Sequence, residues 1–479
     1  MNRLLISAAH KSSGKTTISI GLCAALKKRG LVVQPFKKGP DYIDPLWLGM
    51  AAGRPCYTLD GYLMSPTEIG DEFARHSRGA DIALIEGNKG LYDGLDLDGG
   101  NSNAALATLL DAPVVLVIDA RGMTRGIAPL ILGYQAFDNR IRIEGVILNR
   151  LGGSRHEAKL RAVIEHYTDI PVLGAIQHDE ALQIVERHLG LIPSNEMAAA
   201  NTRIDAIASV IATQVDLEKL LAVASRSGLA RDTLDVACGA MAGKPAPTIN
   251  TIAESKNSVR IGIARDAAFG FYYPGDLDAL QAAGAELVIF DAIHDKTLPA
   301  VDGLFIGGGF PEAHMDALAA NRELQKQISA GIESGMPVYA ECGGLMYLAR
   351  RIEWNGRSAS MVGVIPADIK MHARPVGRGY VHLRETEHGL WPRPGNAASA
   401  ETTPLIHAHE FHYSSVENLP PDVKFAYDVK RGYGIDGEHD GLVYKNLLAS
   451  YTHLRDVASN HWATRFVAFV RRHKHKEPA

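Results

Sequence analysis

Residues 3–17, RLLISAAHKSSGKTT, decide the fold of the N-terminal half of this chain. Residues 3–9 have the apolar character of a buried strand, and Gly14, Lys15 and Thr16 follow after a short turn. A strand, a small turn and a helix start form an anion site, because unpaired backbone N–H groups point at the phosphates. Lys15 then neutralises phosphate charge, and the Thr16 hydroxyl can ligate magnesium. We predict a nucleotide-binding loop, although Ala9 replaces the first glycine of the usual pattern.

The rest of the N-terminal half alternates short β-branched runs with segments of helical spacing. This alternation predicts a parallel sheet covered by helices on both faces. The further strands are expected at residues 32–37, 82–86, 113–119, 143–149 and 171–176.

A polar stretch with proline and glycine, residues 241–257, is typical of a linker. A second strand series follows it, expected at residues 260–264, 286–290, 303–306 and 337–340. With 479 residues the chain is too long for a single core. We therefore predict two tandem α/β domains, at residues 1–240 and 258–470.

The composition excludes several classes of protein. A net charge of -4, with 46% hydrophobic and 22% charged residues, predicts neither a nucleic-acid surface nor a polybasic membrane address. The sequence shows no signal peptide and no apolar run long enough to span a membrane. The four cysteines form no CxxC pair, which fits a reducing cytoplasm.

Acidic residues follow two of the predicted strands of the first half. KKGPDYID, residues 37–44, and EGNKGLYDG, residues 86–94, come where a parallel sheet presents its ligand-binding edge. Magnesium prefers such hard oxygen ligands. Alternatively, Asp41 and Asp93 only form turns, since aspartate beside glycine or proline suits turns.

The second half contains PVYAECGGLMYL, residues 337–348, which predicts a strand, a sharp turn at Cys342 and a helix. At such an elbow the helix dipole is expected to lower the pKa of the thiol and favour the thiolate. His453 is the best candidate for the general base. The backbone of Gly308 and Gly309 could bind an oxyanion. The alternative is a buried structural cysteine.

Several ordered motifs support a family resemblance over nearly the whole chain: GKTT, PFKKGPDYIDP, IEGNKGLYDG, GVILNR, ERHLGL, ARDAAFGFYY, GGGFPE, AECGGLMYL, EFHYS and ASYTHL. Together they resemble the cobyrinate a,c-diamide synthase family of cobalamin biosynthesis. The resemblance implies an N-terminal fold like dethiobiotin synthetase and a C-terminal class I glutamine amidotransferase. It also implies that ATP phosphorylates the a and c acetates of a tetrapyrrole dicarboxylate, and that ammonia from L-glutamine displaces the phosphate.

The resemblance also implies residue roles and a homodimer. Asp41, Asp44 and Asp93 would act in carboxylate activation, Cys342 as the thiolate and His453 as its base. The phosphates, the adenine and Mg²⁺ would be bound by the following residues: Ser12, Ser13, Gly14, Lys15, Thr16 and Thr17 for the phosphates, Asn149 for adenine, and Thr16, Asp41 and Glu86 for the metal.

Two departures from the family pattern affect these expectations. Arg455 stands where the family often has a second histidine, and no acid lies two residues after His453, so we expect a catalytic dyad without an acid. Lys89 follows Asn88 where many members have small apolar residues; it either binds a macrocycle carboxylate or lies on the surface. The substrate therefore stays open between cobyrinate and sirohaem or sirohydrochlorin.

The histidines of the second half also have two interpretations. They either bind the macrocycle or make local hydrogen bonds. They are His372, His382, His407, His409 and His412.

The sequence leaves two rival functions. A nucleotide-driven switch would need its signature lysine at His10, and it gives the second half no purpose. A tetrapyrrole-binding protein with an inactive glutaminase half would show no glutaminase activity with any substrate.

Overall fold

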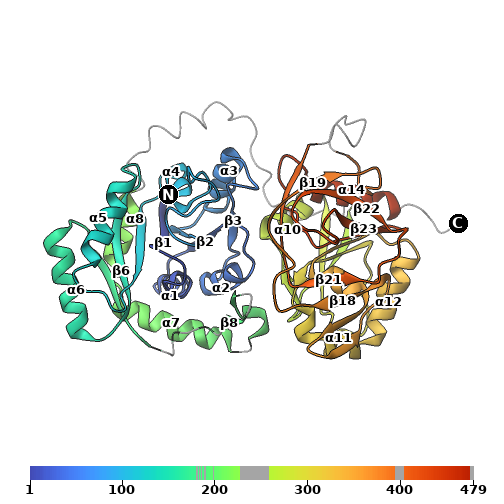
Figure 1. The fold of residues 1–479 in the computed structure, drawn as a ribbon, viewed down its shortest axis with the longest axis horizontal. Coiled ribbons are helices and arrows are strands. Elements are labelled where there is room, and N and C mark those ends of the chain that lie inside the picture. The colour runs from blue at the N-terminus through green and yellow to red at the C-terminus, as the bar shows by residue number, and fades with distance from the viewer. Residues whose placement is uncertain are drawn as a thin grey trace. The chain divides into compact units, whose positions relative to one another are not determined.

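The computed structural model describes residues 1–179, 182, 184, 186–187, 190–197, 199–226, 258–393 and 404–474. Internal contacts divide the chain into two compact units, Met1–Thr248 and Ile249–Ala479, each drawn with its own sheet in Figure 1. The linker predicted at residues 241–257 and two residues of the ERHLGL motif lie outside the described residues. The exact domain limits, 1–240 and 258–470, stay predictions.

The first unit is built on a seven-stranded parallel sheet, as the sequence predicts, with strand order β3-β2-β4-β1-β5-β6-β7. Its central strands are buried on both faces, which explains their continuous apolar runs. The strands are β1 Asn2–Ala8, β2 Val33–Lys38, β3 Tyr57–Leu59, β4 Ile82–Glu86, β5 Val114–Asp119, β6 Ile143–Leu151 and β7 Val172–Gln177.

Helices cover both faces of this sheet. One core cluster joins α1, α2, α7 and α8 to alternate residues of the strands, such as Leu4 and Ile6 of β1. On the opposite face, α3 places Phe73 against Phe36 of β2, with ring centroids 5.0 Å apart. The helices are α1 Lys15–Lys28, α2 Ile43–Ala52, α3 Pro66–His76, α4 Asn103–Leu109, α5 Ile127–Phe137, α6 Ser154–Tyr167, α7 Ala200–Gln214 and α8 Leu217–Ser225; a short hairpin and turn add β8 Glu186–Arg187, β9 Gly190–Leu191 and η2 Ser194–Glu196.

The second unit has a nine-stranded sheet, in which five parallel strands continue into four antiparallel ones. The strand order is β12-β10-β13-β15-β24-β23-β22-β19-β20. The sequence predicted the first four parallel strands but not the antiparallel extension. The strands are β10 Val259–Ala264, β12 Ala285–Phe290, β13 Gly303–Ile306, β15 Val338–Glu341, β24 Leu447–Ser450, β23 His439–Tyr444, β22 Lys424–Arg431, β19 Gly377–Glu385 and β20 Ile406–His412.

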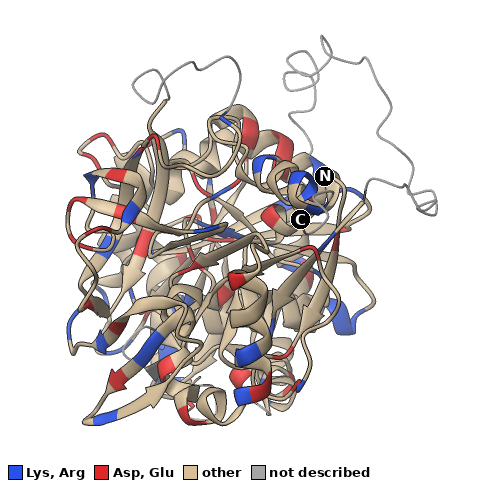
Figure 2. Cartoon of the chain, turned by 90° about the vertical axis from the view of Figure 1, so that its right-hand side faces the viewer, with Lys and Arg blue, Asp and Glu red and all other residues tan. Residues whose placement is uncertain are grey.

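Smaller elements complete the second unit. A four-stranded sheet has the order β17-β16-β18-β21, and β11 pairs with β14 beside the elbow. Acidic and basic residues are interspersed along the ribbon in Figure 2. The elements are β11 Phe269–Phe271, β14 Gly308–Gly309, β16 Ala349–Trp354, β17 Arg357–Ser360, β18 Ile365–Met371 and β21 Ser414–Glu417, with α10 Pro274–Ala282, η5 Pro311–His314, α11 Met315–Ala320, α12 Arg322–Glu333, α13 Gly343–Leu348 and α14 Trp462–Lys474.

The strand predictions agree with the structure to within one or two residues at each end. Ile82–Glu86 and Gly303–Ile306 are confirmed as predicted, while the three-residue strand β3 was missed because its apolar run is too short to stand out. In the described part of the chain, no helix is both long and apolar enough to cross a membrane.

Candidate active sites

The phosphate loop connects β1 to α1, as the sequence predicts. Gly14 precedes the helix with φ of 89°, a left-handed conformation that side chains rarely adopt. Lys15 opens α1 and is buried, and its Nζ donates to the carbonyl oxygen of Lys89 at 2.6 Å. Ser12 is exposed, Ser13 is buried and Thr17 is half-buried in the first turn of α1. The predicted phosphate-binding residues therefore lie together at one turn.

Asn149, at the carboxyl end of β6, lies against this loop. Its Nδ2 donates to the carbonyl oxygen of Ser13 at 2.8 Å. A Cβ on Gly14 would come within 2.2 Å of the same nitrogen, so only glycine fits there. The side chain thus supports the loop in this structure, and its contact with adenine stays a prediction.

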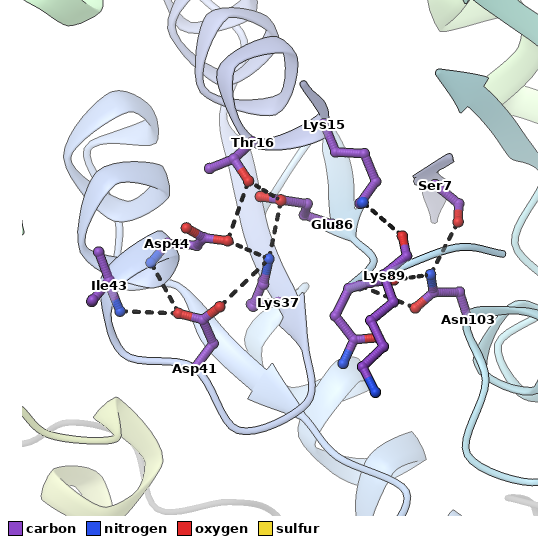
Figure 3. A network of polar contacts seen from close by, with 11 residues as sticks. Ser7, Lys15, Thr16, Lys37, Asp41, Ile43, Asp44, Glu86, Lys89 and Asn103 are labelled. Atoms are coloured by element: carbon purple, nitrogen blue, oxygen red, sulfur yellow. Dashed lines mark hydrogen bonds and ion pairs between the residues drawn. The ribbon is translucent and has the colours of Figure 1, made fainter. Parts of the chain in front are cut away.

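A cluster of charged side chains meets at the carboxyl ends of β2 and β4 (Figure 3). Lys37 directs Nζ to Oδ2 of Asp44 at 2.6 Å, to Oε1 of Glu86 at 3.0 Å and to Oδ2 of Asp41 at 3.7 Å. Thr16 donates from Oγ1 to Oε1 of Glu86 at 2.7 Å and contacts Oδ2 of Asp44 at 3.2 Å. The structure therefore brings together the residues predicted for the metal. The sequence did not single out Lys37, which lies at the centre of these residues. A lysine that follows an apolar run looks, in the sequence, like the exposed end of a strand.

Burial and charge shift the pKa values in this cluster. Burial raises the pKa of Asp41 to about 7, with the neighbouring Asp44 adding to the shift and Lys37 opposing it. Burial also raises the pKa of Glu86, against the effect of Lys37. Burial by itself would lower the pKa of Lys37, but Asp44 and Glu86 outweigh it and raise that pKa well above its usual range. Lys37 is thus held as an ammonium ion, while Asp41 can exchange a proton near neutral pH.

The oxygen donors of the cluster fit Mg²⁺, which takes carboxylate and hydroxyl ligands. Glu86 is fully buried, and its second oxygen, Oε2, has no hydrogen-bond partner among the described residues. Lys37 fills the space between the carboxylates, and no group of three or more His, Cys, Asp or Glu in the described residues could hold a metal by itself. Mg²⁺ would therefore need nucleotide phosphate oxygens as additional ligands.

The loop after β4 carries the remaining acidic candidate. Asp93 is exposed and accepts a hydrogen bond from the backbone N–H of Gly90 at 2.8 Å, so it does form a turn. Burial lowers the pKa of Lys15, and the charge of Asp93 is one of those that oppose this shift. Asn103, which the sequence did not single out, fixes the loop through the carbonyl oxygen of Gly90 at 3.0 Å and the backbone N–H of Asn88 at 3.1 Å. The loop therefore places Asp93 near the phosphate lysine.

The predicted elbow lies between β15 and α13 in the second unit. Cys342 has φ of 48° and ψ of -101°, which is strained for a residue with a side chain. Its backbone N–H donates to the carbonyl oxygen of Ser450 on β24 at 2.7 Å. A Cβ on Gly344 would lie 2.1 Å from the carbonyl oxygen of Ile306, so the chain can approach β13 only because this residue is glycine.

The oxyanion candidates lie beside the elbow. A Cβ on Gly343 would come within 2.9 Å of the backbone nitrogen of Gly309. A Cβ on Gly308 would come within 2.7 Å of Cε1 of His453. Gly308 and Gly309 therefore lie between the cysteine turn and the candidate base, and their oxyanion role stays a prediction.

The structure places an acid beside His453 that the expectation of a catalytic dyad did not include. His453 places Nδ1 3.2 Å from Oε2 of Glu341, and both side chains are buried. The acid comes from the residue directly before Cys342, not from a position after the histidine. The sequence does contain an indication of this acid. A glutamate at the end of an apolar strand such as PVYAE is unusual unless a polar partner lies beside it in the fold.

The expected lowering of the pKa of Cys342 is wrong for this structure. Burial raises the pKa of the thiol, and the charges of Glu312 and then Glu341 add to the increase. The backbone N–H of Gly343, at the start of α13, lowers the pKa but does not offset burial. Cys342 is a thiol at rest and needs a base when the substrate arrives.

The histidines singled out in the second half have local partners. His412 places Nδ1 2.8 Å from the carbonyl oxygen of Ser414 and stacks on Tyr451 with ring centroids 3.8 Å apart. His382 stacks on His407 at 4.6 Å. These contacts match the structural interpretation, while macrocycle binding stays a prediction. Two more rings have partners, His372 on Ser415 and His409 on His453.

The two sites define a class of protein, a glutamine amidotransferase joined to a nucleotide-binding domain. The model of the CobQ/CobB/MinD/ParA nucleotide binding domain matches residues 5–192, and that of the CobB/CobQ-like glutamine amidotransferase domain matches residues 260–460.

Whole-length relatives identify the family. A protein of Magnetococcus marinus is 46% identical over 98% of this chain and 97% of its own length. A protein of Methanosarcina acetivorans is 42% identical over 95% of this chain and 93% of its own length. A protein of Listeria monocytogenes is 38% identical over 95% of this chain and 96% of its own length. All three are named cobyrinate a,c-diamide synthase. The chain belongs to the cobyrinate a,c-diamide synthase family and is a carbon–nitrogen ligase with glutamine as the amido donor.

Nucleotide binding is expected to take up about half a proton at pH 8 through Lys15, since phosphate favours the ammonium form. Burial lowers the pKa of Lys15 to about 8, although Glu86 acts in the opposite direction, so Lys15 is half-protonated at this pH. Calorimetry in buffers of different ionisation enthalpy measures the uptake. The variant Lys15→Arg keeps its charge and should lose this uptake; equal uptake in both proteins would contradict the assignment.

Replacing Gly344 by alanine is expected to abolish glutaminase activity and to cost about 1–3 kcal/mol of stability, because the added Cβ overlaps the carbonyl oxygen of Ile306. Glutamine hydrolysis and thermal unfolding provide the measurements. The matched control is Gly331→Ala in α12, where the new Cβ meets only the flexible methyl end of Met336. A Gly344→Ala protein as active as the control would show that the close approach is not required.

Proposed function

We propose that this enzyme converts the a and c acetate side chains of cobyrinate to amides, using ATP, Mg²⁺ and glutamine. The observation that carries the proposal is the cluster of Thr16, Lys37 and the carboxylates of Asp44 and Glu86 beside the phosphate loop. Such a cluster has the charges needed to place a triphosphate next to a substrate carboxylate. The names of the relatives supply the macrocycle.

In the first unit, an acetate oxygen would attack the γ-phosphorus of ATP, and the bond from that phosphorus to the bridging oxygen would break. ADP leaves and an acyl phosphate remains. Ammonia then attacks the acyl carbon, phosphate leaves, and the amide nitrogen loses a proton. Thr16, Asp41 and Glu86 would hold Mg²⁺, which offsets charge on the phosphates.

The lysines and the other acids of this unit would position the reactants. Lys15 would bind the phosphates from the start of α1, and Lys37 would neutralise the incoming carboxylate. Asp44 keeps Lys37 in place through the 2.6 Å ion pair. Asp93 would orient the acetate, and Asn149 would contact adenine.

In the second unit, the Sγ of Cys342 would attack the carboxamide carbon of glutamine. His453 takes the thiol proton and passes it to the departing ammonia as the C–N bond breaks. The N–H groups of Gly308 and Gly309 would stabilise the oxyanion. Water then cleaves the thioester and releases glutamate.

The names of the relatives favour cobyrinate as the macrocycle, and sirohaem and sirohydrochlorin are outcomes of the test. Lys89 has an exposed side chain, as a contact to a further macrocycle carboxylate requires. The family resemblance further implies a homodimer in the cytoplasm.

Replacing Cys342 by alanine should reduce glutamine-dependent amidation about 10³-fold or more, because the nucleophile is lost. Amidation with ammonium salts should stay within about threefold of the native enzyme, since the first unit is unchanged. The control variant is Cys23→Ala, which removes a buried thiol of the first unit. Loss of the ammonia-dependent reaction in folded Cys342→Ala would contradict the division of labour.

The substrate is tested by offering cobyrinate, sirohaem and sirohydrochlorin separately with ATP, Mg²⁺ and glutamine, followed by mass spectrometry of the products. We expect two amides on cobyrinate, together with two equivalents of ADP. If two amides were found only on sirohaem, or only on sirohydrochlorin, that compound and not cobyrinate would be the substrate. No amide on any of the three, with ATP consumed or not, would refute the proposed activity.

A further inference from the structure

Glu341 is held in one position by three contacts. Its Oε1 accepts from the hydroxyl of Tyr339 at 2.5 Å and from the backbone N–H of Leu454 at 3.0 Å. Its Oε2 lies 3.2 Å from Nδ1 of His453. The side chain is only 4% exposed, so water does not compete for these contacts. The carboxylate therefore has a fixed oxygen directed at the imidazole.

The imidazole of His453 is also restrained from its other side. His409 stacks on it with ring centroids 5.0 Å apart and an interplanar angle of 16°. The two residues exchange backbone hydrogen bonds, His453 N–H to the His409 carbonyl at 2.8 Å and the reverse at 3.3 Å. The hydroxyl of Tyr273 lies 3.3 Å from Nδ1 of His409. Ring rotation of His453 would break the carboxylate contact and the stacking together.

Other charged groups near His453 have different partners. Arg455, two residues along, forms a buried ion pair with Asp276 at 2.6 Å. Asp456, the first acid after the histidine, accepts from the backbone N–H of Ala463 at 2.9 Å, at the start of α14. Asp440 accepts from the backbone N–H groups of Tyr451 and Thr452. Glu341 is thus the acid that the described structure places on the histidine.

We propose that Glu341 is the positioning residue of the glutaminase base, fixing His453 with its Nδ1–H toward the carboxylate. This inference rests on the proposed glutaminase function. In this tautomer Nε2 is the atom that takes the thiol proton, and the carboxylate stabilises the imidazolium that forms. Such a base is needed because burial keeps Cys342 as a thiol until its proton is removed.

The proposal explains why the sequence has no acid two residues after His453. A working base does not require an acid after His453, since the strand that carries the nucleophile also supplies the acid. The β15 and β24 strands pair with Glu341 opposite Ser450, three residues before the histidine. Adjacent parallel strands thus bring nucleophile, acid and base to one edge of the sheet.

The test compares Glu341→Gln with the native enzyme in glutamine hydrolysis. Glutamine has the same shape but is neutral and has a single acceptor oxygen. The hydroxyl of Tyr339 and the N–H of Leu454 both donate to the Oε1 position, so the amide oxygen lies there and its NH2 group faces Nδ1 of His453. kcat should therefore fall about 10²-fold or more. KM for glutamine should stay within about threefold, and amidation with ammonium salts should be unchanged. A low-field ring N–H proton should be seen by NMR in the native enzyme and be displaced in Glu341→Gln. His453→Ala identifies this signal by its absence.

Glu385→Gln is the matched control, since Glu385 is a buried glutamate of the same unit that pairs with Arg465 at 2.6 Å, away from the elbow. It should lower thermal stability but keep kcat per folded molecule. Unchanged kcat in Glu341→Gln, or an equal loss in both variants, would overturn the positioning role. If the native enzyme hydrolyses no glutamine, the proposed function itself fails, which separates the two outcomes.

Discussion

The rest of the first unit depends on the ammonium group of Lys37, which holds together the buried carboxylate of Glu86 and the partly buried carboxylates of Asp41 and Asp44. Asp44 and Glu86 both approach its Nζ to within 3.0 Å, and Asp41 lies slightly farther away. Without a cation, ionised acids buried this close would repel one another, and each would cost several kcal/mol to desolvate. The lysine thus allows the sheet to keep an acidic site at its edge before nucleotide or metal arrives.

The same constraint shapes the second unit, where buried charges are again paired. Glu341 meets His453, and Asp276 meets Arg455. Each of these pairs connects a residue near the elbow to a different element, so the pairs fix the end of β24 relative to β15 and α10. The strained backbone of Cys342 is stable only because these surroundings determine its position. Packing and electrostatics together hold a thiol and an imidazole just beyond the ends of the neighbouring strands β15 and β24.

In both units, residues that are far apart in the sequence are brought together by the same feature of the fold. Parallel strands end at the same edge, so residues far apart in the sequence become neighbours there. Thr16 and Glu86 meet although seventy positions separate them, and Glu341 reaches His453 across more than a hundred. The resting states differ in charge. The first site holds ion pairs, whereas the cysteine of the second is kept neutral by burial.

The sequence by itself determined the strand–turn–helix units, since apolar runs, glycines and a lysine or cysteine at the turn are local signals. It therefore predicted the phosphate loop, the elbow, most parallel strands and the acids that follow them. The antiparallel strands from β19 to β23 escaped prediction because half-exposed strands lack a continuous apolar run. Only the tertiary structure decided that Lys37 lies among the acids and that Glu341 meets His453, because such pairings depend on strand order and on which face a side chain takes. Burial, also a property of the fold, decided that Cys342 rests as a thiol.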